Sequence, residues 1–181
     1  MSGQSQSYER NYNYDMVFGQ QSTNREIYDA VIKNMTKVVL GGYNATIFAY
    51  GVTGAGKTHT MIGYEDEPGL MYYTINDMFE GIRGQMSPRR NSQKNIQIEV
   101  SFLEIYNEQI RDLIVPQGQP LELREDPQSG IQINGLSVFE VKQKDQIFEL
   151  LAKGNAHRTQ ESTRQNQTSS RSHAVLIITY K

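Results

Sequence analysis

A glycine-rich segment that ends in a lysine and a threonine is the part of this sequence best equipped for chemistry. Glycines allow backbone conformations in which several N–H groups converge on phosphate oxygens. In loops of this type the lysine reaches the β- and γ-phosphates, and the hydroxyl of the next residue ligates Mg²⁺. Lys57 and Thr58 would take these two roles here. The segment, which predicts a nucleotide site, is Gly51-Val52-Thr53-Gly54-Ala55-Gly56-Lys57-Thr58.

A phosphate-binding loop needs a strand before it and a helix after it, and the flanking sequence predicts both. The β-branched and aromatic run at 46–50 predicts a buried strand that leads directly into the loop. A helix should begin near Lys57, be interrupted around 63–68, and be followed by a second helix over 70–82. A glycine-rich turn with an incidental lysine is the alternative, and this strand–loop–helix order disfavours it.

A second polar segment lies far downstream and is rich in hydroxyl groups. By itself, such a cluster is typical of a surface loop. Beside a phosphate-binding loop, its hydroxyls are suited to a γ-phosphate and its Mg²⁺, with an arginine next to them. The segment therefore predicts a loop that senses the γ-phosphate, and it reads Asn166-Gln167-Thr168-Ser169-Ser170-Arg171-Ser172-His173.

Composition predicts one domain around these segments. The chain has 181 residues, a formal net charge of −2 and no cysteine, which excludes disulfides, thiolate metal sites and cysteine nucleophiles. The small net charge argues against a general nucleic-acid binder. No apolar run approaches the roughly 20 residues that span a bilayer, so we predict no membrane insertion. Residues 1–11 are expected to be flexible, and 12–181 to form the domain.

Hydrophobic periodicity predicts helices and strands in alternation along the rest of the chain. A capping box at 23–26 should start a helix on which Ile27, Val31 and Val38 recur on one face, with Tyr28, Ile32 and Val39 beside them. The alternation of apolar and polar residues over 95–106 is typical of a strand. Together these elements predict an α/β fold. The further expected elements are a helix at 144–155 and strands at 121–124, 131–133, 137–141 and 174–180.

Five segments of the chain resemble the kinesin motor domain, and they occur in the order and at the spacing of that family. Myosin has a similar phosphate loop and a similar Asn…Ser-Ser-Arg loop, but it lacks the His-Thr-Met and Ser-His continuations present here. Residues 123–126 and 134–136 look most like the eighth kinesin class. The five segments are 14–18 (YDMVF), 42–50 (GYNATIFAY), 51–61 (GVTGAGKTHTM), 102–108 (FLEIYNE) and 166–173 (NQTSSRSH).

The resemblance implies a P-loop NTPase-type three-layer sandwich with a central mixed, mainly parallel sheet. It implies a kinesin-type ATPase that binds ATP or ADP with Mg²⁺ and couples hydrolysis to microtubule binding and movement. Such a protein is expected in the cytoplasm on the microtubule cytoskeleton, with no nucleic-acid partner beyond the nucleotide. Its oligomeric state would be set outside this segment.

The resemblance also implies roles for individual residues. Tyr43 and His59 are similar to positions that pack against adenine, and the amides of 52–58 are similar to those that hold the α- and β-phosphates. Neither histidine, His59 or His173, is predicted as a base. The residues implied to act on the metal, the γ-phosphate and the attacking water are Thr58 and Ser170 as Mg²⁺ ligands, Asn166 and Ser169 beside the γ-phosphate and water, and Arg171 as the partner of a switch II glutamate.

Two segments of the kinesin pattern are missing from this sequence, namely an Arg-x-Arg-Pro strand before residue 12 and the Asp-x-x-Gly switch II. We therefore expect about half of a motor domain, truncated before switch II, with open sheet edges that lower its stability. The alternative is a non-catalytic kinesin-derived nucleotide-binding or microtubule-associated module. The Ser-Ser-Arg-Ser-His loop disfavours an unrelated P-loop ATPase or kinase. For tubulin contact, the hairpin around 121–136 is favoured over the basic residues of 83–94.

Overall fold

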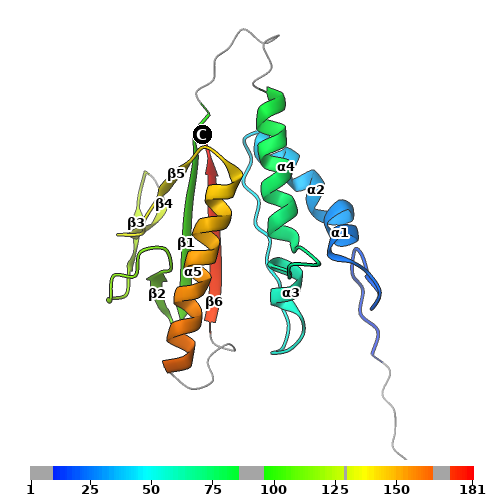
Figure 1. Ribbon diagram of the computed structural model, residues 1–181, viewed down its shortest axis with the longest axis horizontal. Coiled ribbons are helices and arrows are strands. Elements are labelled where there is room, and N and C mark those ends of the chain that lie inside the picture. Colours follow the sequence, from blue (N-terminus) through cyan, green and yellow to red (C-terminus); the bar gives the residue numbers. More distant parts are fainter. Residues whose placement is uncertain (1–9, 86–95, 129, 165–171) are drawn as a thin grey trace, which may run out of the picture.

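The computed structural model of the chain describes residues 10–85, 96–128, 130–164 and 172–181 (Figure 1). Its elements form two groups that lie side by side. One group holds the helices that flank the glycine-rich segment, and the other holds a sheet covered by one long helix.

Residues 24–40 form one continuous helical segment, which consists of α1 (Asn24–Ile27), the π-helical turn η1 (Tyr28–Ile32) and α2 (Lys33–Leu40). The predicted capping box starts it. The Thr23 hydroxyl accepts a hydrogen bond from the Glu26 N–H, and the Glu26 carboxylate accepts one from the Thr23 N–H. These two bonds satisfy N–H groups that the first helical turn leaves without partners.

The buried face of this helical segment overlaps only partly with the predicted one. Tyr28, Ile32 and Thr36 are buried at intervals of four residues, whereas Val31 and Val38 are 40% and 47% exposed. An α-helix repeats every 3.6 residues, so residues four apart drift around its surface. A π-helical turn takes up part of that drift and keeps the buried residues facing inward. Of the residues predicted to share one face, Tyr28 and Ile32 are therefore in the core, whereas Val31 and Val38 are not.

The stretch at 46–50, predicted as a buried strand, forms no strand in the structure. It runs extended from α2 toward the glycine-rich loop (Figure 1), and Phe48 and Tyr50 are 80% and 96% exposed. A strand requires a neighbour that supplies ladder hydrogen bonds. Within the described residues no strand pairs with this stretch, so its β-propensity is not realised.

The predicted interruption of the next helix at 63–68 is confirmed. α3 (Lys57–Met61) is followed by a tight reversal in which Gly63 and Pro68 form a β-bridge, and α4 (Leu70–Gln85) begins directly after it. Gly63 has a φ of +81° and lies against backbone atoms of the returning chain, a position that a side chain would not tolerate.

The main sheet is organised around β1 (Ile98–Tyr106). It pairs with β6 (Ser172–Tyr180) on one side and with β2 (Gln109–Asp112) and β5 (Phe139–Val141) on the other. A separate hairpin is formed by β3 (Glu122–Asp126) and β4 (Gly130–Asn134). All four of these strand pairings are antiparallel. The parallel strand pairs that the resemblance predicts do not occur among the described strands.

Strand β2 was missing from the sequence-based prediction. It follows a two-residue turn at Asn107 and Glu108, whose φ angles are +49° and +64°. Such turns usually carry glycine at one of these positions. Because neither residue is glycine here, the turn residues alone do not predict this hairpin.

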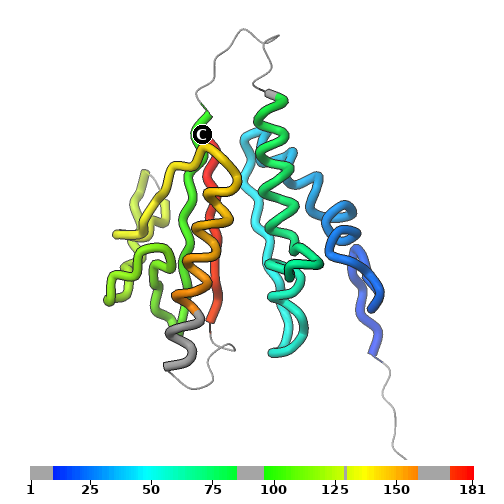
Figure 2. Tube along the Cα trace, in the orientation of Figure 1, coloured from blue at the N-terminus to red at the C-terminus, as the bar shows by residue number. Residues whose placement is uncertain are grey.

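The core lies between one face of the sheet and the helices α4 and α5 (Lys144–Arg164). Figure 2 shows β6, the last strand of the chain, beside β1, with α5 lying over both. Phe102 of β1 is 1% exposed. A Cβ added to Gly154 would lie 2.7 Å from its Cε1 atom, so glycine at this position lets α5 approach the strand closely. On the opposite face, Val175 and Ile177 are each 37% exposed.

Candidate nucleotide-binding site

The glycine-rich segment folds as a loop that ends at the first residue of α3. Gly54 and Gly56 have φ angles of +85° and +86°, a region that other residues rarely adopt. The Lys57 ammonium group lies within the loop and donates to the carbonyl oxygens of Gly51 (2.8 Å) and Val52 (2.9 Å). The lysine side chain is therefore folded back over the loop.

The backbone N–H groups at the end of this loop suit a phosphate. Within the described residues, no carbonyl or side chain accepts a hydrogen bond from the N–H groups of Gly56, Lys57 or Thr58. Thr58 is exposed, with its hydroxyl next to these donors in the chain. The Lys57 ammonium group and these N–H donors together fit the oxygens of a nucleotide phosphate. The Thr58 hydroxyl fits an Mg²⁺ ion bound to that phosphate.

His59, two residues into α3, is held by two residues from other elements. Its Nε2 atom lies 3.1 Å from the Glu67 Oε2 atom, and its backbone carbonyl accepts from the Asn24 side-chain amide at 3.0 Å. The Asn24 N–H donates to the other Glu67 oxygen at 3.0 Å. The N–H of Asn24, with help from His59, lowers the pKa of the Glu67 carboxyl. Asn24 is 2% exposed, so this network fixes α1 against the loop helix.

The structure brings the residues of the predicted phosphate site together but does not place all of the predicted nucleotide site. Gly51, Lys57, Thr58 and His59 lie on one continuous loop and helix, as predicted. Tyr43 is 71% exposed at the beginning of the extended stretch, and no contact joins it to His59. The predicted γ-phosphate and metal residues lie outside the described residues, namely Asn166, Ser169, Ser170 and Arg171.

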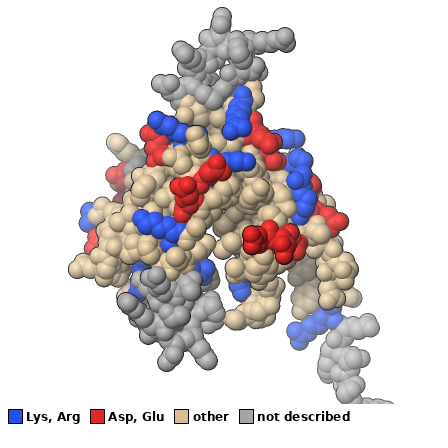
Figure 3. Space-filling model, viewed as in Figure 1, with Lys and Arg blue, Asp and Glu red and all other residues tan. Residues whose placement is uncertain are grey.

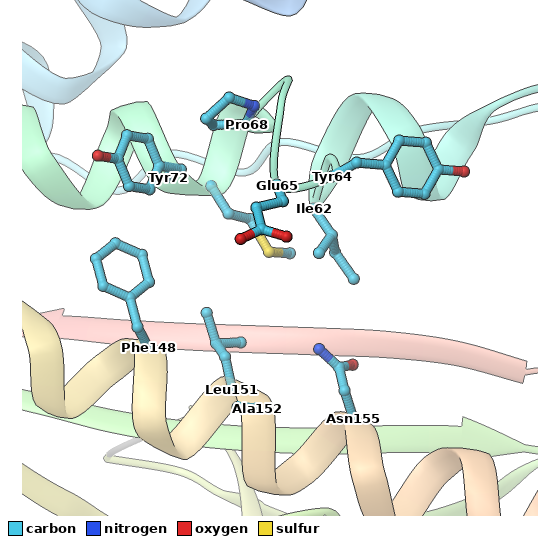
Figure 4. A pocket seen from close by; sticks show the side chains of 10 residues that line it. Ile62, Tyr64, Glu65, Pro68, Tyr72, Phe148, Leu151, Ala152 and Asn155 are labelled. Carbon is cyan, nitrogen blue, oxygen red and sulfur yellow. The ribbon is translucent and has the colours of Figure 1, made fainter.

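A pocket that sequence reasoning did not predict lies between the α3–α4 reversal and α5 (Figure 4). It has a volume of about 370 Å³. Tyr72 of α4 stacks on Phe148 of α5 at one end, with ring centroids 5.4 Å apart, and Asn155 lies toward the other end. Glu65 points into the space between the two walls. The lining is largely apolar because α4 and α5 are amphipathic helices that meet over the sheet.

Sequence reasoning also missed a buried ion pair at the start of β6. Glu104 of β1 is 5% exposed, and its Oε1 atom accepts from Arg158 Nε of α5 at 3.2 Å and from the Ser172 hydroxyl. A signal for it was present in the strand pattern. The alternation that directs Val100 and Phe102 inward also directs Glu104 inward, and a carboxylate on a buried face requires a partner.

Charged side chains are interspersed on the face of the molecule shown in Figure 3. Acidic and basic groups alternate over the described elements, without a broad patch of one sign. Within the described part of the chain, no helix is long and apolar enough to cross a membrane.

The fold and the loop together are those of a P-loop protein of the α/β class, and comparison with known proteins gives the family. The family model of the kinesin motor domain matches residues 1–181. The chain belongs to the kinesin motor domain family, as the sequence segments indicated. Kinesin motor domains in general bind ATP or ADP with Mg²⁺.

Relatives agree with the resemblance to the eighth kinesin class. The chain is 46% identical to kinesin-like protein KIF18B of Gallus gallus over 168 residues, which is 93% of this chain and 20% of that protein. It is 45% identical to KIF19 of Homo sapiens over 97% of this chain and 17% of that protein. Kinesin-like protein KIN-8B of Arabidopsis thaliana is 45% identical over 98% of this chain and 21% of its own length.

A solved structure confirms the fold class. The structure described as that of a fast kinesin, with implications for its ATPase mechanism and its interactions with microtubules, matches with a TM-score of 0.85 and 35% identity. The match covers 93% of this chain and 48% of that one. The chain thus spans about half of that structure and about one fifth of the length of the curated relatives it matches.

Proposed function

We propose that this chain binds Mg²⁺-ATP at the 51–58 loop and serves as the nucleotide-binding part of a microtubule motor. The observation that carries the proposal is the position of the Lys57 ammonium group, 2.8 and 2.9 Å from the Gly51 and Val52 carbonyl oxygens. It lies inside a loop whose last N–H groups have no acceptor among the described residues.

The chain's own groups account for phosphate binding. Lys57 exchanges the two loop carbonyls for β- and γ-phosphate oxygens, while the N–H groups of Gly56, Lys57 and Thr58 donate to the phosphates. The Thr58 hydroxyl ligates Mg²⁺, and His59 contacts the adenine together with Tyr43. When bound, the metal neutralises charge that develops as the γ-phosphate is transferred to water.

The remaining roles fall on the segment before β6. Ser170 is the second metal ligand, Asn166 and Ser169 orient the γ-phosphate and the attacking water, and Arg171 pairs with a glutamate of switch II. Catalysis in such sites depends on positioning and on electrostatic stabilisation rather than on a side chain that takes the proton directly.

Microtubules are the proposed partner, and the β3–β4 hairpin is the proposed contact. Leu123 and Ile131 lie on the same face of this hairpin and are 58% and 70% exposed, although Glu125 and Asp126 add negative charge beside them. The protein is accordingly proposed to act on the microtubule cytoskeleton in the cytoplasm.

The test is nucleotide binding and hydrolysis by wild type and Lys57→Ala, with and without microtubules. Wild type should bind a fluorescent ATP analogue in the presence of Mg²⁺, and Lys57→Ala should weaken binding at least tenfold, a loss of about 1.4 kcal/mol. Lys33→Ala, which removes an exposed lysine that pairs with Asp29, is the matched control and should bind as wild type does.

The outcomes distinguish an ATPase motor from a non-catalytic nucleotide-binding module. Unchanged affinity in Lys57→Ala contradicts the site. Binding accompanied by hydrolysis that microtubules stimulate supports an ATPase motor, whereas binding without turnover supports the non-catalytic nucleotide-binding module.

A further inference from the structure

We propose that Glu67 is a positioning residue for the nucleotide base and acts through the imidazole ring of His59. Its carboxylate fixes the orientation in which that ring meets adenine, so it adds to the affinity for ATP without touching the nucleotide. The inference rests on the proposed function, because only a bound nucleotide presents a base to His59.

The Glu67 carboxylate joins α1 and α3 to the reversal between α3 and α4. Its Oε2 atom lies 3.1 Å from His59 Nε2, and its Oε1 atom accepts from the Asn24 N–H at 3.0 Å. The side-chain amide of Asn24, which is 2% exposed, donates in turn to the His59 carbonyl oxygen at 3.0 Å. His59 is therefore held at both its backbone and its side chain, and Glu67 supplies the side-chain contact.

The reversal that carries Glu67 is bonded to the last residue of the glycine-rich loop. The Gly63 N–H donates to the Thr58 carbonyl oxygen at 3.1 Å. Within the reversal, the Tyr64 N–H donates to the Glu67 carbonyl oxygen at 2.9 Å. Because its backbone is tied in this way to the residue directly before His59, the Glu67 carboxylate keeps a defined position relative to the imidazole ring.

The imidazole ring of His59 is restrained but not enclosed. Tyr64 packs against it with ring centroids 5.4 Å apart, and 36% of the His59 side chain is exposed. An aromatic ring with an accessible face suits stacking on a base. A side chain without partners loses rotamer freedom when a ligand fixes it. Since Glu67 has already ordered the ring, stacking of the base costs less free energy.

The carboxylate also determines which ring nitrogen carries the proton. The Asn24 N–H, with help from His59, lowers the pKa of the Glu67 carboxyl, so the group is ionised at neutral pH. An ionised carboxylate only accepts hydrogen bonds. In a neutral His59 the protonated nitrogen must therefore be Nε2, and this assignment can be tested without nucleotide.

The main experiment compares Glu67→Ala with wild type in the full chain. Calorimetric titration in the presence of Mg²⁺ measures the affinity for ATP, which carries a base, and for inorganic tripolyphosphate, which does not. Because the ring is freed but not removed, ATP binding should weaken about fivefold, less than the loss of a whole stacking contact. Tripolyphosphate affinity should change less than about twofold, since an exposed carboxylate acts on the phosphates only through a screened charge.

Glu65→Ala is the matched control. Glu65 belongs to the same reversal and carries the same charge, but it points into the pocket beside α5 (Figure 4). Among the described residues, no hydrogen bond joins it to His59. Its affinities for ATP and for tripolyphosphate should equal those of wild type. An equal loss of ATP affinity in Glu65→Ala and Glu67→Ala would overturn the proposal.

A double-mutant cycle tests whether Glu67 acts through His59. His59→Ala should weaken ATP binding about tenfold. Glu67→Ala added to it should have no further effect, because the ring through which the carboxylate acts is gone. If the double variant loses as much again as Glu67→Ala loses alone, the route through His59 is rejected.

The ring proton gives a readout that does not depend on the nucleotide. In wild type, the ¹⁵N chemical shifts of neutral His59 should place the proton on Nε2. In Glu67→Ala no carboxylate selects that nitrogen, so both tautomers should be populated. A wild-type ring with its proton on Nδ1, or an unchanged tautomer in Glu67→Ala, contradicts the contact on which the inference depends.

The remaining outcomes distinguish the inference from the proposed function. Equal losses for ATP and tripolyphosphate in Glu67→Ala, or a wild type that binds both equally well, overturn the positioning role but leave the phosphate site in place. If Glu67→Ala does not fold, Glu67→Asp keeps the charge and withdraws it from His59, and wild-type ATP affinity in that variant rejects the inference. A wild-type chain that binds neither ligand refutes the proposed function itself.

Discussion

Two apolar stretches of similar composition, 46–50 and β6, adopt different backbone states. Both are rich in β-branched and aromatic residues. β6 pairs with β1 along all nine of its residues, and its Leu176 packs into the core. The stretch 46–50 pairs with no described strand, and Phe48 is 80% exposed. Ile47 packs against the cluster of Tyr28, Ile32 and Leu70, so what this stretch lacks is a neighbouring strand that supplies ladder hydrogen bonds.

The two groups of elements around these stretches are also held together differently. β6 belongs to a sheet whose inner face is covered by α4 and α5. The stretch 46–50 is followed by the glycine-rich loop, which is held through contacts of α1 with His59 and Glu67. The first group is held by packing on a sheet, whereas the second combines an apolar cluster around Tyr28, Ile32 and Leu70 with a small number of polar contacts.

The largest expected difference is between two phenylalanines. Phe102→Ala removes a ring that is 1% exposed and should lower the free energy of unfolding by about 3–5 kcal/mol. Phe48→Ala, the control in the unpaired stretch, should change it by no more than about 0.5 kcal/mol. Denaturant unfolding measures both. Equal losses would show that Phe48 is packed in solution as tightly as Phe102.

A second test uses glycines in the two long helices. A Cβ at Gly154 of α5 would press on the Phe102 ring and lie 3.3 Å from Leu113 Cβ, so Gly154→Ala should destabilise the chain by about 1–3 kcal/mol. Gly84 of α4 has no atom within 4 Å of such a Cβ. Gly84→Ala should therefore stabilise by up to about 1 kcal/mol. Opposite signs in thermal unfolding support close packing of α5 on β1, and a neutral Gly154→Ala argues against it.

The smallest expected effect concerns pH and the polar contacts of the loop group. Hydrogen bonds from the Asn24 N–H and from His59 lower the pKa of Glu67 in the folded state from its ordinary 4.5. The folded state thus binds the proton less readily than the unfolded state does. Glu67 consequently contributes stability above that ordinary value, and the contribution is lost as pH falls through the lowered pKa.

The measurement is the unfolding free energy as a function of pH in wild type and Glu67→Gln. The variant should show a weaker loss of stability on acidification, because glutamine does not titrate. Glu26→Gln, at the exposed capping box, serves as the comparison for a carboxylate that lies away from His59. Identical pH profiles in wild type and Glu67→Gln would contradict an ionic role for Glu67 in holding α1 to the loop helix.

Part of the fold followed from local sequence. The strand at 98–106, the interruption at 63–68 and the capping box at Thr23 depend on alternation, glycine and hydrogen-bonding side chains that lie close together in the chain. The same holds for the loop at 51–58, because its glycines, lysine and threonine are consecutive. These features need no distant partner and could be predicted.

Other features depended on distant residues. The π-helical turn at 28–32 and the exposure of Val31 and Val38 reflect which face α4 covers. The partner of Glu104 is 54 residues away in the chain, and the contact between the Asn24 amide and the His59 carbonyl joins residues 35 apart. No periodicity in the sequence encodes such pairings.

By itself, the sequence determined the glycine-rich loop at 51–58 and most of the helices and strands, since each depends on the residue types within a few positions. Only the tertiary structure decided that β6 is a strand and 46–50 is not, and that Glu104 meets Arg158 and Ser172. The physical reason is that a strand needs a ladder partner and a buried charge needs a counter-charge, and the fold supplies both from distant parts of the chain.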